Sequence, residues 1–418
     1  MNHVILGNGP TGVVAAETLR RLAPTDGIVL VGDEPEPPYS RMAIPYLLHG
    51  AIGESGTYLR KGADHFAGQR IELVTGRAES VDTNARTVKL AGGRVLRYDR
   101  LLIATGAHPN RPPIPGIDLP NVLSCWTLAD ARRIMAIAKP GVRVLQMGAG
   151  FIGCIIMESL ASRGVALTVV EMGNRMVPRM MTQGAGDLIR RWCESKGIRV
   201  HTNAKVASIA KDGAGLVATL GDGSRIAADL IISATGVVPN IGFLRGSGVA
   251  CDQGVLVDAR MATNVAGVYA AGDVAQSPAF AGGAPIVNMI QPIAADEARI
   301  AATNMSGREA ASTGSLPINV LDTLGLIASS FGQWQGVPAA EGGDAVEVCD
   351  AGRFRYLRLE FKDDVLIGAT SLGLTEHVGV IRGLIQGRVR LGAWKETLKR
   401  DPSKLMDAYL ACGQRRAA

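Results

Sequence analysis

The hydrophobic and polar positions of the first part of the chain form the same pattern twice. A short apolar run at 4–6 leads into a glycine-rich turn, an alanine-rich helical stretch and a second apolar run at 28–31. The pattern begins again at 142–147 and closes with an apolar run at 166–170. A buried strand, a tight glycine turn, a helix and a second buried strand are typical of a parallel βαβ unit. The sequence therefore predicts two βαβ units in one chain.

The rest of the pattern indicates two links and a further domain. The proline-rich stretch 109–120 and the short stretch 236–240 are typical of places where a chain crosses between domains. From about residue 316 the pattern changes to short strands, which two helical patterns follow. We expect the strands at 354–361 and 365–368, and the helices at 378–386 and 403–411.

Composition places the chain among folded proteins with several domains. It has 418 residues, of which 47% are hydrophobic and 20% charged, which suits domains of about 100–200 residues each. No run of 18 apolar residues exists and the N-terminus enters a strand at once, so we expect neither a membrane span nor a signal peptide. Six cysteines are scattered without a CxxC pair: Cys125, Cys154, Cys193, Cys251, Cys349 and Cys412. This usage predicts reduced thiols, a cytoplasmic location and no metal site.

The net charge of +6 is concentrated near the C-terminus. Residues 382–416 hold nine Lys or Arg and three Asp or Glu, which equals the whole surplus. Such a segment is either a solvated face or a docking surface for an acidic partner. Nucleic acid is not an expected partner, because no aromatic residues interleave with the charges and no known binding module accompanies them.

The first glycine turn has the residue types that a dinucleotide phosphate site needs. Gly7 permits a tight turn, Gly9 lets the backbone approach a pyrophosphate, and Gly12 lets the helix pack close to the strand. The predicted phosphate-binding residues are Gly7, Gly9, Pro10, Thr11 and Gly12. An acid at the end of the second strand binds the ribose hydroxyls in such units, and Asp33 is our first choice, with Glu34 as the alternative.

The second glycine turn repeats this logic with its own acid, Glu171. The predicted binding residues of this turn are Gly148, Gly150, Phe151, Ile152 and Gly153. A carboxylate at the end of the second strand accepts hydrogen bonds from a free 2′-hydroxyl and repels a 2′-phosphate, so NADH is favoured over NADPH. Arg175 and Arg179 follow closely and leave the NADPH alternative open.

Five motifs in a fixed order give the chain a resemblance to a known family. Between and after the two glycine turns stand Ala104-Thr105-Gly106, Ala234-Thr235-Gly236 and Ala271-Gly272-Asp273. Over residues 1–310 the chain resembles the FAD/NAD-linked reductases of the glutathione-reductase structural family. The resemblance implies an α/β fold with two Rossmann-like domains, the NAD domain inserted in the FAD domain, and a smaller α+β C-terminal domain. The implied boundaries are 1–113 and 238–315 for FAD, 114–237 for NAD and 316–418 for a C-terminal interface domain.

The resemblance also implies roles for residues outside the glycine turns. Gly272 and Asp273 match the turn that binds the ribityl chain and pyrophosphate of FAD, and Gln291-Pro292 match the start of a helix that faces the flavin. A helix dipole at that place stabilises negative charge on a reduced flavin. The remaining matches are Ala104, Thr105 and Gly106 beneath the FAD, Ala78 against the adenine, and Gly236 near the second crossing.

A proline-rich segment narrows the resemblance within this family. Residues 34–41, Glu-Pro-Glu-Pro-Pro-Tyr-Ser-Arg, resemble a stretch of the ferredoxin reductases of oxygenase systems, of rubredoxin reductases and of the FAD part of NADH-nitrite reductases. Arg41 matches an arginine that contacts an FAD phosphate in those proteins. The alternative is a surface loop with a solvated arginine.

Cysteine content excludes one branch of the family. Its disulfide reductases carry CxxxxC after this loop, and its peroxidases and water-forming oxidases carry one cysteine there, whereas this chain has its first cysteine at Cys125. Many relatives also carry a Lys where this chain has Tyr46, and a Glu where it has Ile155. Tyr46 either hydrogen-bonds near the flavin or fills the space of that Lys. Glu158, one turn further along than Ile155, is a candidate substitute for the missing Glu.

The combined reading is an NADH-dependent FAD reductase. Its expected acceptor is an acidic one-electron carrier of ferredoxin or rubredoxin type, or a partner redox subunit, because no cysteine relays the electrons onward. A homodimer is possible. A peroxide-forming NADH oxidase or a reductase of a small acceptor is the first alternative. A flavoprotein whose response to NADH is conformational, with an interaction role, is the second.

Overall fold

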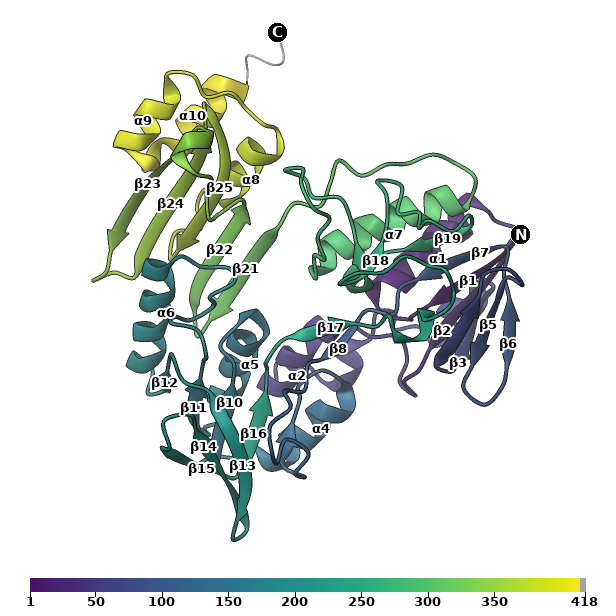
Figure 1. The fold of residues 1–418 in the computed structure, drawn as a ribbon, viewed down its shortest axis with the longest axis horizontal. Coiled ribbons are helices and arrows are strands. Elements are labelled where there is room, and N and C mark those ends of the chain that lie inside the picture. The colour runs from purple at the N-terminus through teal and green to yellow at the C-terminus, as the bar shows by residue number, and fades with distance from the viewer. Residues whose placement is uncertain (414–418) are drawn as a thin grey trace. The chain divides into compact units, whose positions relative to one another are not determined.

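The computed structural model describes residues 1–413, which fold into two units. The first unit comprises Met1–Pro109, Trp126–Leu128 and Val237–Ser315. The second comprises Asn110–Cys125, Ala129–Gly236 and the chain from Leu316 onward (Figure 1). The three domains and the boundaries expected from the sequence stay predictions. Of the basic residues counted near the C-terminus, Arg415 and Arg416 lie outside the described residues.

The first unit is built around a parallel five-stranded sheet with the order β19-β7-β1-β2-β3. Its strands are β1 (Asn2–Leu6), β2 (Gly27–Gly32), β3 (Ile71–Thr75), β7 (Arg100–Ile103) and β19 (Val268–Ala270). Leu6 lies opposite both Val31 and Ile103, and Ile103 lies opposite Ala270, so the segments that follow these four strands meet at one edge. The first predicted βαβ unit is confirmed as β1, α1 (Pro10–Leu22) and β2.

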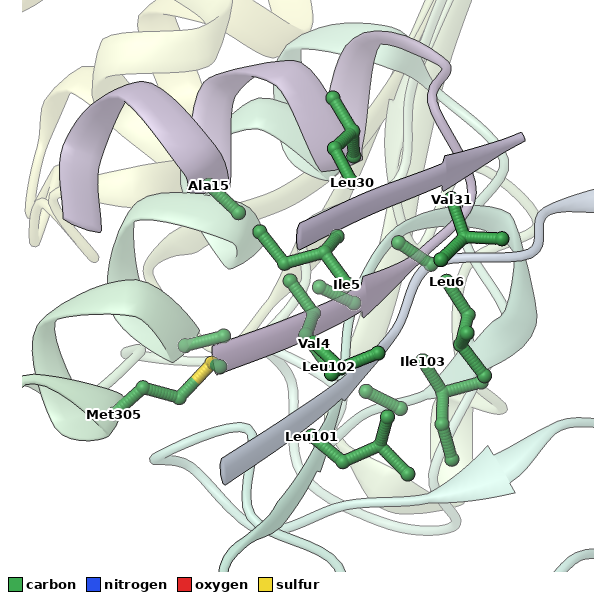
Figure 2. Close-up of a cluster of buried hydrophobic side chains, with 14 of the residues drawn as sticks. Val4, Ile5, Leu6, Ala15, Leu30, Val31, Leu101, Leu102, Ile103 and Met305 are labelled. Carbon is green, nitrogen blue, oxygen red and sulfur yellow. The ribbon is translucent and has the colours of Figure 1, made fainter. Parts of the chain in front are cut away.

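The core of this unit joins the sheet to α1 and to α7 (Gln291–Met305). Figure 2 shows side chains of β1, β2 and β7 gathered with Ala15 of α1 and Met305 of α7. Val4, Ile5 and Leu6 follow one another and are all buried, so both faces of the sheet are covered. This is why the strands of the sheet are continuous apolar runs instead of alternating ones.

Smaller elements complete the first unit. They are a three-stranded antiparallel sheet of β4 (Ala78–Asp82), β5 (Thr87–Leu90) and β6 (Val95–Arg97), the pair β18 (Val255–Leu256) with β20 (Ala275–Gln276), helices α2 (Ile44–His49) and α3 (His65–Gly68), and 3-10 turns at Arg41–Ala43, Glu54–Thr57, Gly242–Leu244 and Gly272–Val274. The antiparallel pair of β8 (Ala107–Pro109) and β17 (Val237–Pro239) lies where the chain leaves the unit and returns to it.

The second unit contains the second predicted βαβ unit, which is also confirmed. Its parallel sheet has the order β12-β11-β10-β16-β9. The strands are β9 (Val122–Leu123), β10 (Arg143–Met147), β11 (Ala166–Val170), β12 (Arg199–His201) and β16 (Leu230–Ser233), with helices α4 (Leu128–Ile137), α5 (Phe151–Ala161) and α6 (Gln183–Ser195) and an antiparallel sheet of β13 (Val206–Asp212), β14 (Gly215–Leu220) and β15 (Arg225–Ala228). Met147 lies opposite Val170 and Ser233, so the segments after these strands share an edge.

The chain after residue 316 forms an antiparallel sheet with the order β21-β22-β25-β24-β23. Its strands are β21 (Ile318–Thr323), β22 (Leu326–Gly332), β23 (Gly343–Asp350), β24 (Arg355–Lys362) and β25 (Val365–Leu372), with a 3-10 turn at Ala339–Glu341, and the helices after it are α8 (Val378–Gln386), α9 (Trp394–Arg400) and α10 (Leu405–Gly413), with a 3-10 turn at Pro402–Lys404 (Figure 1). The sequence did not predict α9, because Leu398 is its only buried residue and no helical period is visible. No helix among residues 1–413 combines the length and apolar character that crossing a bilayer requires.

Candidate functional site

The first glycine turn packs tightly on one side and is open on the other. Gly7 has a φ of +109°, and a Cβ there would collide with the carbonyl oxygen of Ala104. A Cβ at Gly12 would collide with the carbonyl oxygen of Gly7. A Cβ at Gly9 would meet nothing within 4 Å. Two glycines therefore let the turn, the helix and the neighbouring strand approach one another, while the third presents bare backbone to open space.

The starts of α1 and α5 both leave backbone N–H groups without a side-chain cap. Gly9 precedes α1 and Gly150 precedes α5, and neither has a side chain that could accept from the first helical N–H groups. The predicted residues Pro10 and Thr11 form the first turn of α1, and Phe151 and Ile152, both half-buried, form that of α5. Uncapped N–H groups and a positive dipole end suit a phosphate. Both turns therefore fit the pyrophosphate of a dinucleotide.

The second glycine turn has the same contacts as the first. A Cβ at Gly148 would collide with the carbonyl oxygen of Ala234, and one at Gly153 would lie close to the carbonyl oxygen of Gly148. A Cβ at Gly150 would meet nothing within 4 Å. The turn also has a support that the sequence analysis missed. The buried side chain of Gln146 donates to the carbonyl oxygens of Gly148 at 2.9 Å and of Gly153 at 3.0 Å.

Glu171 lies at the end of β11 and is 9% exposed. One carboxylate oxygen accepts from the N–H of Ala149 at 2.7 Å and the other from the N–H of Gly173 at 2.7 Å. Each oxygen retains a further lone pair for a hydroxyl group. Arg175 uses its guanidinium to hold the following loop, donating to the carbonyl oxygens of Met181 and Pro178, whereas Arg179 is exposed.

The acids after β2 have different environments. Asp33 is exposed at the end of the strand. Glu34 accepts from Arg41 at 2.7 Å and from the hydroxyl of Tyr39 at 2.6 Å. Arg41 also donates to the carbonyl oxygen of Trp126 at 2.7 Å, and its guanidinium lies 5.4 Å from the centre of the Trp126 ring. Glu34 is thus committed to Arg41, which leaves Asp33 as the acid that faces solvent.

The Ala271-Gly272-Asp273 turn follows β19 and contacts the first glycine turn. Gly272 has a φ of +77°, and a Cβ there would collide with the hydroxyl of Thr11. Only glycine fits where the two predicted FAD turns approach so closely. Burial raises the pKa of Asp273 to about 6, and the charge of Arg41 acts in the opposite direction.

Each Ala-Thr-Gly turn is closed by an asparagine that the sequence analysis did not single out. In the first unit, the amide of Asn240 donates to the carbonyl oxygen of Thr105 at 2.7 Å, and its backbone N–H donates to Gly106 at 2.9 Å. In the second unit, the amide of Asn110 donates to the carbonyl oxygen of Thr235 at 3.5 Å, and its backbone N–H donates to Gly236 at 2.9 Å. Ala104 directly follows β7 at the shared edge.

The other predicted residues are more dispersed. Gln291 begins α7 and accepts from the hydroxyl of Ser40 at 2.7 Å, with the exposed Pro292 next to it. Ala78 is the half-buried first residue of β4. Tyr46 on α2 is 61% exposed, and Glu158 on α5 is half-buried. The structure brings Gly7, Thr11, Ala104 and Gly272 together at one edge of the first sheet.

Three of the buried thiols lie in environments that suppress their reactivity. Burial raises the pKa of Cys125 and of Cys193 to about 12, and it raises the pKa of Cys154 well above its ordinary value. Thiols, and not thiolates, are therefore present at these three positions near neutral pH. Cys251 and Cys349 are exposed. Residues 1–413 contain no group of three or more His, Cys, Asp or Glu that could hold a metal ion.

Known proteins resemble this chain over most of its length. It is 32% identical over 393 residues to the NADH-dependent phenylglyoxylate dehydrogenase subunit epsilon of Aromatoleum evansii, covering 93% of this chain and 92% of that protein. It is 30% identical over 410 residues to the ferredoxin–NAD(+) reductase component of the biphenyl dioxygenase system of Paraburkholderia xenovorans, covering 97% and 98%. The ferredoxin reductase for the CYP199A2 system of Rhodopseudomonas palustris has a TM-score of 0.84 at 26% identity, covering 92% of this chain and 95% of that chain.

These matches confirm the resemblance that the five motifs indicated, the α/β fold class, and an oxidoreductase whose cofactors are FAD and NADH. The family model described as pyridine nucleotide-disulphide oxidoreductase matches residues 1–287. The matched residues include both glycine turns, both Ala-Thr-Gly turns and the Ala-Gly-Asp turn. The chain is a member of the pyridine nucleotide-disulphide oxidoreductase family.

Proposed function

We propose that this chain passes electrons between NADH and a one-electron carrier of ferredoxin or rubredoxin type, or a partner redox subunit, with FAD as the intermediate. The observation that carries the proposal is the lack of a redox thiol. The unit with the predicted FAD turns contains one cysteine, Cys251, whose sulfur contacts the carbonyl oxygen of Val249 at 3.6 Å beside the short strand β18. Electrons therefore have no sulfur relay by which to leave the flavin.

The relatives support both kinds of acceptor. A ferredoxin–NAD(+) reductase component matches nearly the whole chain, and so does one subunit of a dehydrogenase with several subunits. Rhodocoxin reductase of Rhodococcus erythropolis is 32% identical over 312 residues, which are 73% of this chain and 72% of that one. Small iron–sulfur carriers are usually acidic, which suits the basic segment of this chain.

Residues of the second unit are assigned to the binding of NADH, and residues of the first unit to the binding of FAD. We assign Glu171 and the uncapped start of α5 to the ribose and phosphates of NADH, with Gln146 supporting the glycine turn between them. We assign Asp33, Thr11 and Asp273 to the binding of FAD, with Arg41 as a positive charge near Asp273. Bound FAD supplies the conversion between two-electron hydride chemistry and single-electron transfer. Catalysis by these residues is positioning, and no proton donor is assigned.

The basic segment after α8 offers fewer unpaired charges than its composition indicates. Lys395 and Lys399 both contact Asp344, at 3.2 Å and 2.7 Å. Arg388 and Arg390 are exposed, although Arg390 also contacts Asp364 at 3.2 Å. Because both side chains are exposed, we assign these two arginines to docking of an acidic carrier.

An NADH oxidase is the second candidate, because an NADH oxidase of Methanocaldococcus jannaschii is 30% identical over 320 residues, covering 74% of this chain and 71% of that one. Anaerobic stopped-flow mixing with NADH, followed by a two-iron ferredoxin or by air, distinguishes the candidates. We expect fast bleaching of the flavin, fast reoxidation by ferredoxin and slow reoxidation by air. Rapid reoxidation by air with stoichiometric peroxide would assign the oxidase. A long-lived charge-transfer complex with slow turnover would assign the conformational role.

A further inference from the structure

Glu297 is a buried acid that neither the motifs nor the proposed electron transfer uses. It lies in the second turn of α7 and is 6% exposed. One carboxylate oxygen accepts from the N–H of Gly272 at 2.9 Å, and the other accepts from the hydroxyl of Ser277 at 2.8 Å. Both donors belong to the segment that contains the Ala-Gly-Asp turn. A single side chain on α7 therefore spans this turn and the residue just after β20.

The Glu297 carboxylate and the Thr11 hydroxyl both lie against Gly272. Gly272 lies directly against the hydroxyl of Thr11 in the first glycine turn. Its N–H is held from α7 by Glu297. The Gly272 backbone is thus fixed between the helix that begins the unit and the helix that ends it. Asp273, the next residue, takes its orientation from this fixed backbone.

A carboxylate in this place is costly to keep. Burial raises the pKa of Glu297 to about 7, and the neighbouring Asp273 and Asp296 add to this rise. Burial of an acid beside another acid lowers stability unless strong hydrogen bonds compensate. A leucine would fill the same space without burying a charge, but it would leave the N–H of Gly272 and the hydroxyl of Ser277 without this acceptor. The two hydrogen bonds to the turn are therefore what the acid contributes.

We propose that Glu297 is a positioning residue for FAD: it accepts hydrogen bonds from Gly272 and Ser277 and so holds Asp273 where it binds the cofactor. The proposal rests on the binding of FAD by the first unit. Both carboxylate oxygens of Glu297 accept from donors of the segment that contains the turn, so Glu297 acts through that segment. Its loss weakens FAD binding while NADH binding, which belongs to the other unit, stays unchanged.

Two substitutions of Glu297 distinguish the effect of its side-chain length from the effect of its charge. Glu297→Gln keeps the length of the side chain: its amide oxygen accepts from Gly272, and its amide nitrogen donates to the Ser277 hydroxyl, which accepts as well as donates. Glu297→Asp keeps the charge, but its shorter side chain cannot span both partners. Glu297→Leu removes both hydrogen bonds. Asp296→Asn is the matched control, because Asp296 is the exposed neighbour on α7 and contacts Arg299.

The experiment measures the dissociation constant for FAD by titrating apoprotein and following quenching of flavin fluorescence, with NADH affinity as a parallel readout. We expect the constant to rise about ten- to hundredfold in Glu297→Asp and Glu297→Leu, in line with the loss of one or two hydrogen bonds to a charged group. It stays within about threefold of wild type in Glu297→Gln and Asp296→Asn. Hydrogen exchange at the Gly272 amide speeds up in Glu297→Asp and Glu297→Leu.

Wild-type affinity for FAD in Glu297→Asp would overturn the proposal. Weakened FAD binding in Glu297→Gln together with unchanged FAD binding in Glu297→Asp would also overturn it, because the charge of the side chain and not its length would then matter. If Glu297→Leu does not fold, the comparison of Gln with Asp decides. A wild-type protein that binds FAD tightly and does not reduce a ferredoxin would contradict the proposed function and leave this test intact.

Discussion

The side-chain amide of Asn240 donates to the carbonyl oxygen of Thr105 at 2.7 Å, and the hydroxyl of Thr105 donates to the backbone carbonyl of Asn240 at 3.0 Å. Asn110 and Thr235 repeat the exchange in the second unit, where the amide contact is 3.5 Å and the hydroxyl contact 3.1 Å. Each Ala-Thr-Gly turn is thus closed by an asparagine that belongs to one of the two links. The shorter amide contact lies in the first unit, to which we assign FAD.

This asymmetry predicts different effects for two equivalent substitutions. Asn240→Ala removes a short hydrogen bond beside the FAD turn, and we expect the dissociation constant for FAD to rise about tenfold. Asn110→Ala removes a long contact, and we expect NADH affinity to fall no more than about threefold, with FAD affinity unchanged. Titration of both cofactors against both variants checks this. Equal effects of the two variants on FAD would contradict the relationship.

Substitution of Gln146 is predicted to weaken NADH binding selectively. Gln146→Met keeps the length of the side chain and removes both hydrogen bonds to the glycine turn. Because two buried carbonyl groups lose their donors, we expect KM for NADH to rise about tenfold. The FAD content of the purified variant is the internal control and stays at the wild-type level. An unchanged KM with normal folding would show that the turn keeps its shape without this support.

Glu171 predicts the preference for NADH. Glu171→Gln leaves one amide oxygen for two backbone N–H donors and removes the charge that repels a 2′-phosphate. We expect the ratio of kcat/KM for NADH to that for NADPH to fall at least about tenfold. Arg179→Ala is the companion variant, because Arg179 is exposed nearby. If only Arg179→Ala changes the ratio, the arginine and not the acid sets the preference.

The raised pKa values of Asp273 and Glu297 predict that the FAD-free protein loses stability as the pH rises. Both folded-state values, about 6 and about 7, lie above the ordinary values of 3.8 and 4.5. Their stabilising contribution is therefore complete below about pH 4 and is lost as the pH rises through 6 and 7. Each group contributes on the order of 3 kcal/mol at most.

Urea unfolding of the apoprotein at pH 5 and pH 8 measures this effect. We expect Glu297→Gln to lose less unfolding free energy between these two pH values than wild type, because residue 297 no longer titrates. Asp296→Asn, at an exposed position, removes only the smallest cause of the raised Glu297 pKa, so its pH dependence stays close to that of wild type. An identical pH dependence in wild type and Glu297→Gln would show that Glu297 does not titrate in this range.

The two exposed arginines predict the docking surface for the carrier. We expect the double substitution Arg388→Glu and Arg390→Glu to raise KM for an acidic ferredoxin about tenfold at low salt and to leave KM for NADH unchanged. Arg353→Glu, at a position that is 76% exposed in the turn after β23, is a single charge reversal of the same kind outside the segment. An unchanged KM for the carrier at low salt would rule out docking at Arg388 and Arg390.

Sequence periodicity predicted the framework closely where burial is continuous. The strand expected at 166–170 and the helix expected at 378–386 have the bounds that the structure gives them. Both have strong signals, since β11 is buried at four consecutive positions, three of them apolar, and α8 has a one-sided apolar face. Helix α9 has no such signal.

The residues that the sequence analysis missed contact partners that are far away along the chain, so no local sequence pattern reveals them. Asn240 lies 135 positions from Thr105 in the chain, and Gly272 lies 25 positions from Glu297. Gln146 interrupts an apolar run, where it looks like a weak strand position until the carbonyl groups of Gly148 and Gly153 are placed beside it. The glycines were predictable because their role depends on their own backbone. The supports were not, because their role depends on a backbone that only the fold brings near.

The pairing of the two links has a consequence for how such a chain could arise. Pro109 and Val237 lie opposite one another in β8 and β17, so the backbone departs and returns at neighbouring positions. A few residues of ordinary hairpin loop in place of 110–236 would keep that pairing, together with the Thr105–Asn240 exchange. Residues 110–236 thus take the place of the loop of a β-hairpin. Loop tips are sites where the insertion of a domain is tolerated without loss of the surrounding fold.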